Sequence, residues 1–169
     1  MVRVLMHGCC GAMGRVITGL TADREGLKIV AGVERNTDDS LGYPVFQSLE
    51  ACDVEVDAII DFTAAPAVDH LLDYCAEKKV PVVLCSTGLS DAQMAKVSES
   101  AKKVAVLRSA NMSLGINTLM KLIQDAAKVL ATAGFDMEIV EKHHRLKLDA
   151  PSGTALALAD SLNEAMDNQ

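Results

Sequence analysis

The sequence predicts an α/β fold built on a doubly wound parallel sheet, and three observations carry that prediction. Apolar, β-branched segments alternate with segments of helical period along most of the chain. The apolar segments lack a regular alternation with polar residues, which is typical of strands buried on both faces between helices. A glycine-rich turn follows the first of these segments, as expected where a strand turns tightly into a helix.

The order of these segments defines the expected elements and domains. Residues 114–132 form the longest expected helix, which leads out of the sheet. We therefore expect a first domain over residues 1–112 and the start of a smaller α+β domain over residues 113–169. Strands are expected over 2–7, 27–34, 56–63, 80–86, 103–109 and 136–143, and helices near 12–22, 66–78, 90–102, 114–132 and 153–167.

Composition argues against several classes of protein. Half of the residues are apolar, but no apolar run approaches the ~18 residues of a membrane span, and no secretory pattern precedes the first strand, so a cytoplasmic protein is expected. The formal charge of −7, with only two tyrosines and three phenylalanines, disfavours a nucleic-acid surface. The five cysteines have no metal-ligand spacing, which indicates reduced thiols. The adjacent His143 and His144 are poorly placed to share one metal, so no metal site is expected.

The glycine-rich segment VRVLMHGCCGAMGRVI places Gly8, Gly11 and Gly14 between the first expected strand and the first helix. Glycines permit a tight turn, close approach of a pyrophosphate to the backbone and close helix–strand packing, while the helix amides face the phosphates. Against the usual GxGxxG spacing, Gly11 and Gly14 match the last two glycines and Cys9 takes the first position. The loop favours a dinucleotide site in a Rossmann-type fold, and an ordinary glycine-rich turn is the alternative.

The end of the second expected strand strengthens the dinucleotide interpretation. Glu34 follows Gly14 by twenty residues, where an acid would bind the ribose 2′-OH. Arg35 could instead pair with a 2′-phosphate, or belong to a solvated strand end. NADH and NADPH therefore both remain open as cofactors.

Small and polar residues also end the later strands of the expected sheet. DFT (61–63), CSTG (85–88) and SANMS (109–113) follow the third, fourth and fifth expected strands. In this architecture the loops at the carboxyl ends of the strands line the ligand crevice. Several such loops in register favour a nucleotide site over a set of unrelated turns.

The segment EKHHRLKLDAPSGTA (141–155) concentrates positive charge in an acidic protein. Histidine exchanges protons near neutral pH, and a lysine among other cations can donate one. Pro151 suits the approach to a helix, Ser152 is a candidate N-cap, and the amides of Gly153 and Thr154 would face an anion at the helix start. These features suggest a carboxylate substrate, whereas a solvated basic loop before a plain helix cap explains the residues alone equally well.

The same segment resembles the E-x-H-H-R-x-K-x-D-x-P-S-G-T-A signature of the 4-hydroxy-tetrahydrodipicolinate reductase family, also called dihydrodipicolinate reductases, of the diaminopimelate route to lysine. GCCGAMGR, ER, DFT and STG occur in the family's order, so the resemblance covers essentially the whole chain. It implies NAD(P)H-dependent reduction of 4-hydroxy-tetrahydrodipicolinate to tetrahydrodipicolinate, with hydride from the nicotinamide. It also implies a homo-oligomer, which is a tetramer in the family.

The resemblance assigns roles to individual residues. His143 matches the acid/base histidine, and Lys147 matches the proton donor. The substrate-binding residues would be His144, Ser152, Gly153 and Thr154. The cofactor-binding residues would be Gly8, Cys9, Cys10, Gly11, Ala12, Met13, Gly14, Glu34, Arg35, Cys85, Ser86, Thr87, Ser109, Ala110, Asn111 and Met112.

Three departures from the family pattern accompany the resemblance. Cys85 stands where glycine is common and is expected to crowd the nicotinamide loop. Met112 replaces a common aromatic residue, so a flexible thioether would pack against the cofactor in place of a ring. Family members usually continue beyond the length of this chain, so a strand over 136–143 would lack sheet partners. A non-catalytic nucleotide-binding fragment or assembly module is therefore the alternative to a reductase.

Overall fold

The computed structural model describes residues 1–36, 39–109, 111–145, 147 and 150–166. The chain divides into two compact units, Met1–Ser109 and Ala110–Gln169, at a point close to the division expected from the sequence. Among the described residues, no helix combines the length and the apolarity that a membrane crossing requires.

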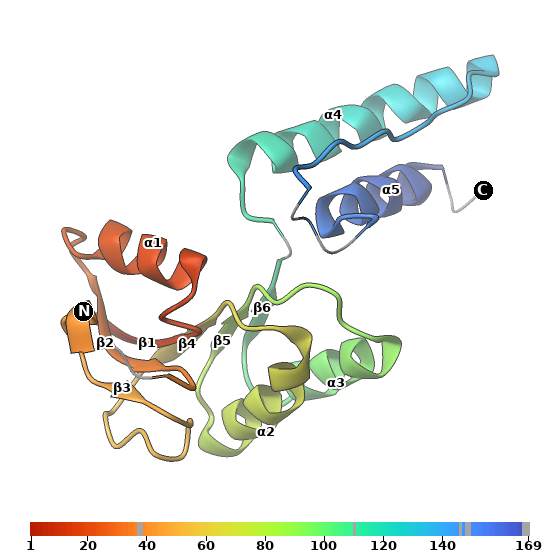
Figure 1. Cartoon of the computed structure of the whole chain (residues 1–169). Coiled ribbons are helices and arrows are strands. Elements are labelled where there is room, and N and C mark those ends of the chain that lie inside the picture. Colours follow the sequence, from red (N-terminus) through yellow and green to blue (C-terminus); the bar gives the residue numbers. More distant parts are fainter. Residues whose placement is uncertain (37–38, 110, 146, 148–149, 167–169) are drawn as a thin grey trace. The chain divides into compact units, whose positions relative to one another are not determined.

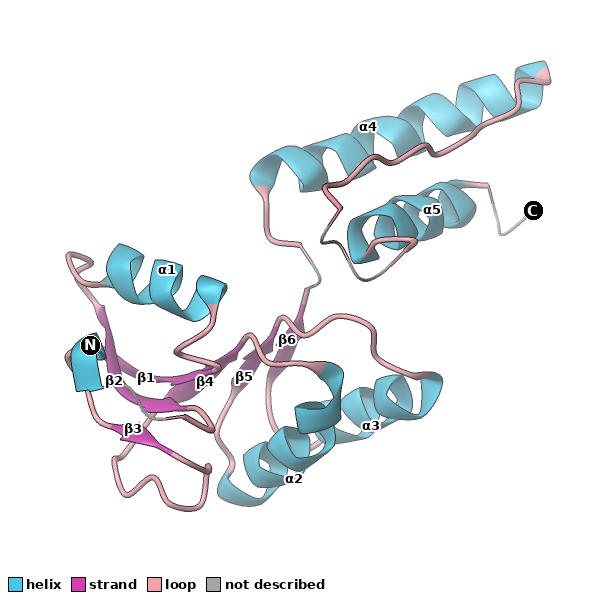
Figure 2. Cartoon of the chain, viewed as in Figure 1, coloured by secondary structure: helices cyan, strands magenta, loops and turns pink. Residues whose placement is uncertain are grey.

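The first unit contains the doubly wound parallel sheet that the sequence predicts (Figure 2). Among the described residues its six strands lie in the order β3-β2-β1-β4-β5-β6, so the direction of winding reverses between β1 and β4. Strand β3 was not predicted from the sequence. It has only two residues, too few to show an apolar pattern, and it pairs with the end of β2. The strands are β1 Val2–His7, β2 Leu27–Val33, β3 Val45–Phe46, β4 Ala58–Asp61, β5 Val82–Leu84 and β6 Val106–Arg108.

Helices cover both faces of this sheet, as Figure 1 shows. On one face, Val4 and Met6 of β1 belong to a buried cluster against which Ile17 packs. On the other face, Leu5 of β1 belongs to a cluster that includes Leu71. Successive side chains of a strand point to opposite faces, so one apolar run supplies both cores. The helices are α1 Ala12–Thr21 on the first face, and α2 Val68–Lys78 and α3 Asp91–Ala101 on the second, with short 3-10 turns η1 Asp39–Leu41 and η2 Ala65–Ala67.

The carboxyl ends of the strands lie level with one another across the sheet. His7 pairs with Val33 on one side and Asp61 on the other, Asp61 pairs with Leu84, and Leu84 pairs with Arg108. Strands β4, β5 and β6 end earlier than the sequence predicted, because the paired register stops at this row. The residues that follow the row therefore belong to loops along one edge of the sheet.

The second unit is helical in its described residues. It contains α4 Leu114–Leu130, the 3-10 turn η3 Ala131–Ala133 and α5 Gly153–Ala165, close to the helices expected from the sequence. Ser113 caps α4 through its hydroxyl, which accepts a hydrogen bond from the amide of Ile116. Helices α4 and α5 pack together, and the Ser161 hydroxyl donates to the carbonyl of Met120 at 3.4 Å.

The prediction of a strand over residues 136–143 is wrong. The segment is present without regular secondary structure, and its apolar residues Ile139 and Val140 are exposed. A strand requires a neighbour that pairs with its N–H and C=O groups. The regular elements among the described residues of this unit are all helical, so the apolar, β-branched segment has no strand with which to pair.

Candidate nucleotide-binding and catalytic sites

The glycine loop after β1 adopts a conformation that needs glycine at two positions. Gly8 has a φ of +83°, a conformation that side chains other than glycine rarely adopt. A Cβ on Gly14 would lie 2.3 Å from the carbonyl oxygen of Gly8 and 2.6 Å from that of Cys9. The first turn of α1 therefore lies directly against the loop backbone. This is the tight strand-to-helix turn that lets a pyrophosphate approach helix amides.

The side chain of Cys9 lies beneath this loop and packs against β2. Its side chain is fully buried, and its sulfur fills the space in which a Cβ on Gly32 of β2 would stand. Burial raises the pKa of the Cys9 thiol to about 12, and the neighbouring Cys10 thiol, 3.8 Å away, contributes in the same direction. Cys9 thus supports the loop from below as an uncharged packing group.

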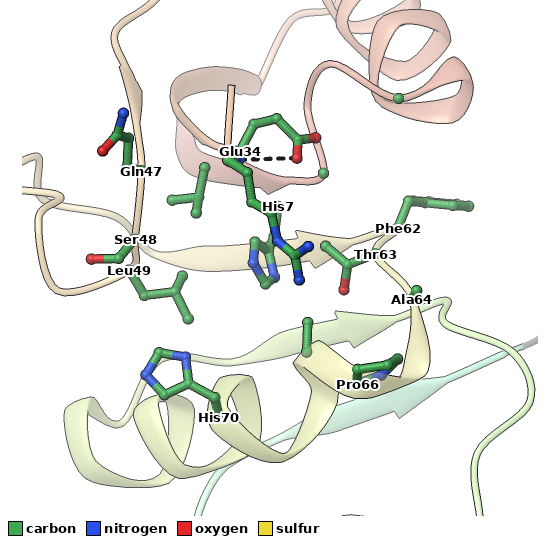
Figure 3. Close-up of a pocket in the computed structure, with 15 residues that line it drawn as sticks. His7, Glu34, Gln47, Ser48, Leu49, Phe62, Thr63, Ala64, Pro66 and His70 are labelled. Atoms are coloured by element: carbon green, nitrogen blue, oxygen red, sulfur yellow. Dashed lines mark hydrogen bonds between the residues drawn. The ribbon is translucent and has the colours of Figure 1, made fainter. Parts of the chain in front are cut away.

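A cavity of about 580 Å³ lies over the carboxyl ends of the strands, at the reversal between β1 and β4 (Figure 3). Ligands of doubly wound sheets bind at this position. Four of the cofactor residues predicted from the sequence line it: Gly8, Gly11, Glu34 and Arg35. Phe62 and Thr63 also line it, as expected for the loop that follows the third predicted strand. No sequence motif marked several other lining residues, which include His7, Gln47, Ser48 and His70.

Glu34 and Arg35 hold the end of β2 at the rim of this cavity. The Glu34 amide donates to the carbonyl of Phe46 at 2.9 Å, which fixes the position of the strand end. The Arg35 amide donates to Oε1 of Glu34 at 3.0 Å, as Figure 3 shows. The carboxylate suits a ribose 2′-OH and the guanidinium suits a 2′-phosphate. The glycine turn, the cavity and this acid together fit a dinucleotide.

The three predicted cofactor residues of the loop after β5, Cys85 to Thr87, do not all face the same side. Ser86 is buried, and its hydroxyl donates to Oδ2 of Asp61 at 2.6 Å. Cys85 is also buried, which raises the pKa of its thiol to about 11, with a further contribution from the charge of Asp61. Thr87 is exposed. Residues Cys85 to Thr87 lie outside the lining of the cavity, so their predicted contact with a cofactor stays a prediction.

The remaining predicted cofactor residues lie on α1, after β6 and in the second unit. Ala12 and Met13 form the first turn of α1, where Met13 is 46% exposed. The Ser109 amide continues the sheet by donating to the carbonyl of Leu84 at 3.1 Å. Ala110 lies outside the described residues. Asn111 and Met112 belong to the second unit, and Met112 is half exposed.

The start of α5 is built as the sequence predicts. Ser152 is the N-cap, and its hydroxyl accepts a hydrogen bond from the amide of Ala155 at 3.1 Å. Oε1 of Glu141 accepts from the amide of Ser152 at 2.9 Å, which places a carboxylate at the positive end of the helix. The Ser152 side chain and then its amide lower the pKa of Glu141, and His143 and Lys147 contribute smaller effects in the same direction. Gly153 and Thr154 lie in the first turn beside that carboxylate.

Glu141 also faces the histidine that the signature singles out. Its second oxygen, Oε2, lies 3.6 Å from Nδ1 of His143, which is an electrostatic contact but too long for a hydrogen bond. That oxygen is buried and makes no hydrogen bond with the described residues. The side chain of His143 is 39% exposed. One carboxylate therefore connects a partly exposed imidazole to the start of a helix.

The neighbouring residues of the signature form a turn. The amide of Lys147 donates to the carbonyl of His144 at 3.1 Å, and Lys147 is partly buried while His144 is exposed. Asn111 connects a second part of this unit to the signature, because its Nδ2 donates to the hydroxyl of Thr154 at 3.1 Å. A residue assigned to the cofactor and one assigned to the substrate thus contact each other.

Each of the two units matches a known protein family model. A family model described as the N-terminus of dihydrodipicolinate reductase matches residues 2–112, and one described as its C-terminus matches residues 115–169. The chain belongs to the dihydrodipicolinate reductase family. It is 47% identical over 166 residues to the 4-hydroxy-tetrahydrodipicolinate reductase of Caldanaerobacter subterraneus subsp. tengcongensis, covering 98% of this chain and 65% of that relative. For the Clostridium tetani reductase, the identity is 44%, covering 97% of this chain and 64% of that relative.

Solved structures agree with the family assignment. A dipicolinate-bound dihydrodipicolinate reductase from Paenisporosarcina sp. TG-14 is 30% identical, with a TM-score of 0.79, and the match covers 98% of this chain and 66% of that chain. The myo-inositol 2-dehydrogenase of Lactobacillus plantarum, at 14% identity and a TM-score of 0.60, covers 76% of this chain and 42% of its own and shares the fold alone. This member of the family spans about two thirds of the length of the curated relatives that it matches.

Proposed function

We propose that this chain acts, by itself or within a longer protein, in the NAD(P)H-dependent reduction of 4-hydroxy-tetrahydrodipicolinate to tetrahydrodipicolinate. The observation that carries the proposal is the contact of Glu141 with both His143 and the N-cap of α5. It gathers an acid/base group and an anion-binding helix start into one segment, in a family whose related structure is named as binding dipicolinate. The finding that supports the cofactor class is the cavity beside the glycine loop.

In the first unit, we expect the residues of the cavity to bind the dinucleotide. Gly8 and Gly11 leave the backbone open for the pyrophosphate, and Glu34 or Arg35 reads the adenosine ribose. The cofactor, when bound, supplies a hydride. The protein's contribution is to hold and orient it and to keep the loops at the strand ends in place.

In the second unit, we expect the signature segment to bind a dicarboxylate and to manage a proton. The net reaction replaces a hydroxyl with hydrogen, so one hydride and one proton are consumed and one water leaves. Lys147 would donate the proton, and His143 would act as acid/base, with its imidazolium stabilised by the carboxylate of Glu141. The amides of Gly153 and Thr154, together with His144, would hold a substrate carboxylate at the helix start.

The direct test is consumption of NADH or NADPH in the presence of the product of the preceding synthase. We expect an absorbance decrease at the nicotinamide band that depends on both the synthase product and this chain. Binding of cofactor without that turnover, in a preparation where a longer family member turns over, would limit the chain to a part of the enzyme.

The roles of the signature residues are tested by comparing turnover with cofactor affinity. His143→Gln and Lys147→Ala should each lower kcat by roughly 10²–10⁴-fold, the usual contribution of a positioned acid or base. Their affinity for NADPH, measured by calorimetry, should stay close to that of the unaltered protein. Lys121→Ala, which removes an exposed lysine paired with Asp125 on α4, is the matched control and should leave both quantities unchanged. Equal losses of NADPH affinity in both signature variants would contradict the assignment.

Cofactor preference is tested at the rim of the cavity. Arg35→Ala should weaken NADPH binding by on the order of tenfold, the size expected for one charge-assisted contact. Binding of NADH serves as the internal control, because NADH lacks the 2′-phosphate. An unchanged ratio of the two affinities would show that Arg35 does not reach that phosphate.

A second candidate function is a non-catalytic nucleotide-binding or assembly module. One observation favours it: the first unit has a complete sheet with a cavity, whereas residues 136–143 of the second unit form no strand among the described residues. Calorimetry separates the two functions. NADPH binding that pyridine-2,6-dicarboxylate leaves unaffected, together with absent turnover, would support the module.

The oligomeric state and the cellular location are also part of this proposal. We expect a homo-oligomer, a tetramer by resemblance to the family, and a cytoplasmic location. Light scattering coupled to size-exclusion chromatography measures the oligomer directly, and a monomer at micromolar concentration would contradict the first expectation.

A further inference from the structure

The strongest feature outside the proposed roles is the buried carboxylate of Asp61, at the end of β4. Its side chain has no exposed surface, and it lies beside the reversal of strand order between β1 and β4. Oδ1 accepts a hydrogen bond from the Thr63 hydroxyl at 2.7 Å. Oδ2 lies 2.6 Å from the Ser86 hydroxyl, whose single proton is shared between this oxygen and the Thr63 carbonyl oxygen, also at 2.6 Å. The Thr63 amide adds a longer contact to Oδ1 at 3.4 Å.

The third partner of Asp61 is His7, the last residue of β1. Nδ1 of His7 lies 2.9 Å from Oδ1 of Asp61, but the carboxylate lies off the direction of the ring N–H, so the contact is electrostatic more than a directed hydrogen bond. His7 lines the cavity together with Glu34 and Thr63, and all three are labelled in Figure 3. His7 also precedes Gly8, so its position determines where the glycine loop begins.

One carboxylate therefore connects the ends of three neighbouring strands: β1 through His7, β4 through Thr63 and β5 through Ser86. Burial alone would raise the pKa of Asp61, but the contacts from His7, Ser86 and Thr63 outweigh that effect and lower it. The group is thus ionised at neutral pH. A buried carboxylate needs several donors to offset its lost hydration, and here every donor comes from a residue at the ligand edge of the sheet.

The position of this network indicates which half of a dinucleotide it serves. A dinucleotide lies across the reversal point of a doubly wound sheet, with one mononucleotide on each side. Glu34, at the end of β2, defines the adenosine side. Thr63 and Ser86 follow β4 and β5, on the opposite side of β1. We propose that Asp61 is a positioning residue for the nicotinamide half of the cofactor: it touches no ligand itself but holds His7, Thr63 and Ser86 in place.

This inference rests on the proposed function only for the class of cofactor, and its test needs no turnover. Asp61→Asn keeps the size of the side chain and removes its charge. Calorimetry of the 169-residue chain compares NADPH with adenosine 2′,5′-bisphosphate, which carries the adenosine half alone. We expect the dissociation constant for NADPH to rise on the order of tenfold, and that for the bisphosphate to change by less than about twofold.

The matched control is Asp57→Asn, at the amino end of the same strand. Asp57 is also a hydrogen-bonded carboxylate, held by Arg3 at 2.6 Å, and its replacement should leave both affinities unchanged. Ser86→Ala is a milder variant for the case in which Asp61→Asn does not fold. This substitution removes the buried hydroxyl that donates to Asp61. The affinity for NADPH should again fall, while the affinity for the bisphosphate should stay the same.

The outcomes distinguish this inference from the proposed function. Equal weakening of both ligands in Asp61→Asn or Ser86→Ala would mean that Asp61 only supports the fold, which overturns the inference and leaves the cofactor class intact. Unchanged NADPH affinity in both variants would overturn it as well. If the unaltered chain bound neither NADPH nor NADH, the proposed cofactor and the inference would fall together.

Discussion

Replacement of Gly14 by alanine is the most direct perturbation of the glycine loop. The new Cβ would stand 2.3 Å from the carbonyl oxygen of Gly8, and 2.6 and 2.7 Å from the carbonyl oxygen and carbon of Cys9. All three atoms belong to the backbone, so no side chain can rotate away. Either the loop or the first turn of α1 must move, and we expect both the stability of the first unit and its nucleotide affinity to fall.

The magnitude follows from two opposing terms. Forcing an additional carbon into a tightly packed site costs about 1–3 kcal/mol. Exchange of glycine for alanine in a helix stabilises the folded state by about 0.5–1 kcal/mol, because alanine loses less conformational entropy on folding. The steric term is the larger, so we expect a net loss of up to about 2.5 kcal/mol. Each kcal/mol lost lowers the melting temperature of a domain of this size by roughly 4–8 °C.

Gly19→Ala is the matched control, because it makes the same change in the same helix. A Cβ on Gly19 meets no atom within 4 Å, so only the favourable helix term remains and the free energy of unfolding should rise by about 0.5–1 kcal/mol. Urea denaturation followed by circular dichroism measures both variants. If Gly14→Ala were as stable as Gly19→Ala, the close packing of α1 on the loop would be incorrect, and so would the steric explanation for glycine there.

Two further predictions concern titratable groups. Because folding lowers the pKa of Glu141, its carboxylate adds stability above the pKa of the unfolded chain and loses that contribution as the pH falls through the folded value. Glu141→Gln, which keeps an acceptor for the Ser152 amide, should therefore destabilise the second unit at pH 7, and in acid denaturation the difference from the unaltered protein should shrink as the pH falls below the ordinary range of a glutamate. Burial raises the pKa of Cys75 to about 12 and that of Cys85 to about 11, so both should resist iodoacetamide at pH 8 in the folded protein. The partly exposed Cys10 should be alkylated before them, and mass spectrometry of peptides would contradict this if Cys75 or Cys85 reacted first.

Local sequence signals predicted those features that depend on one short segment. The glycine spacing located the loop after β1 because steric requirements of neighbouring backbone atoms act over a few residues. The N-cap at Ser152 was predictable for the same reason, since its hydroxyl bonds to the amide of Ala155 three positions later. The alternation of apolar and helical segments was sufficient for the parallel sheet.

Features assembled from distant segments could not be predicted in this way. Gln47 and His70 line the cavity from two different parts of the chain, and no motif marks either residue. Asp61 was visible in the sequence as a polar residue that ends an apolar strand, a signal that merits attention wherever a buried strand ends in an acid. Its partners His7 and Ser86 became apparent only when the register placed three strand ends side by side.

The two candidate sites differ in how their geometry is maintained, and this difference has a consequence for function. The nucleotide loops follow strand ends that are fixed in one row by the sheet and joined by Asp61, so their positions rest on many contacts within a single unit. The signature segment has no strand beneath it in the described residues, and among the contacts that anchor it, Glu141 joins His143 to α5. Cofactor affinity should therefore tolerate substitutions on the surface of the first unit. Acid/base chemistry, by contrast, requires the reacting groups to stay within hydrogen-bond reach, so it should respond steeply to any change that releases residues 141–152 from the start of α5.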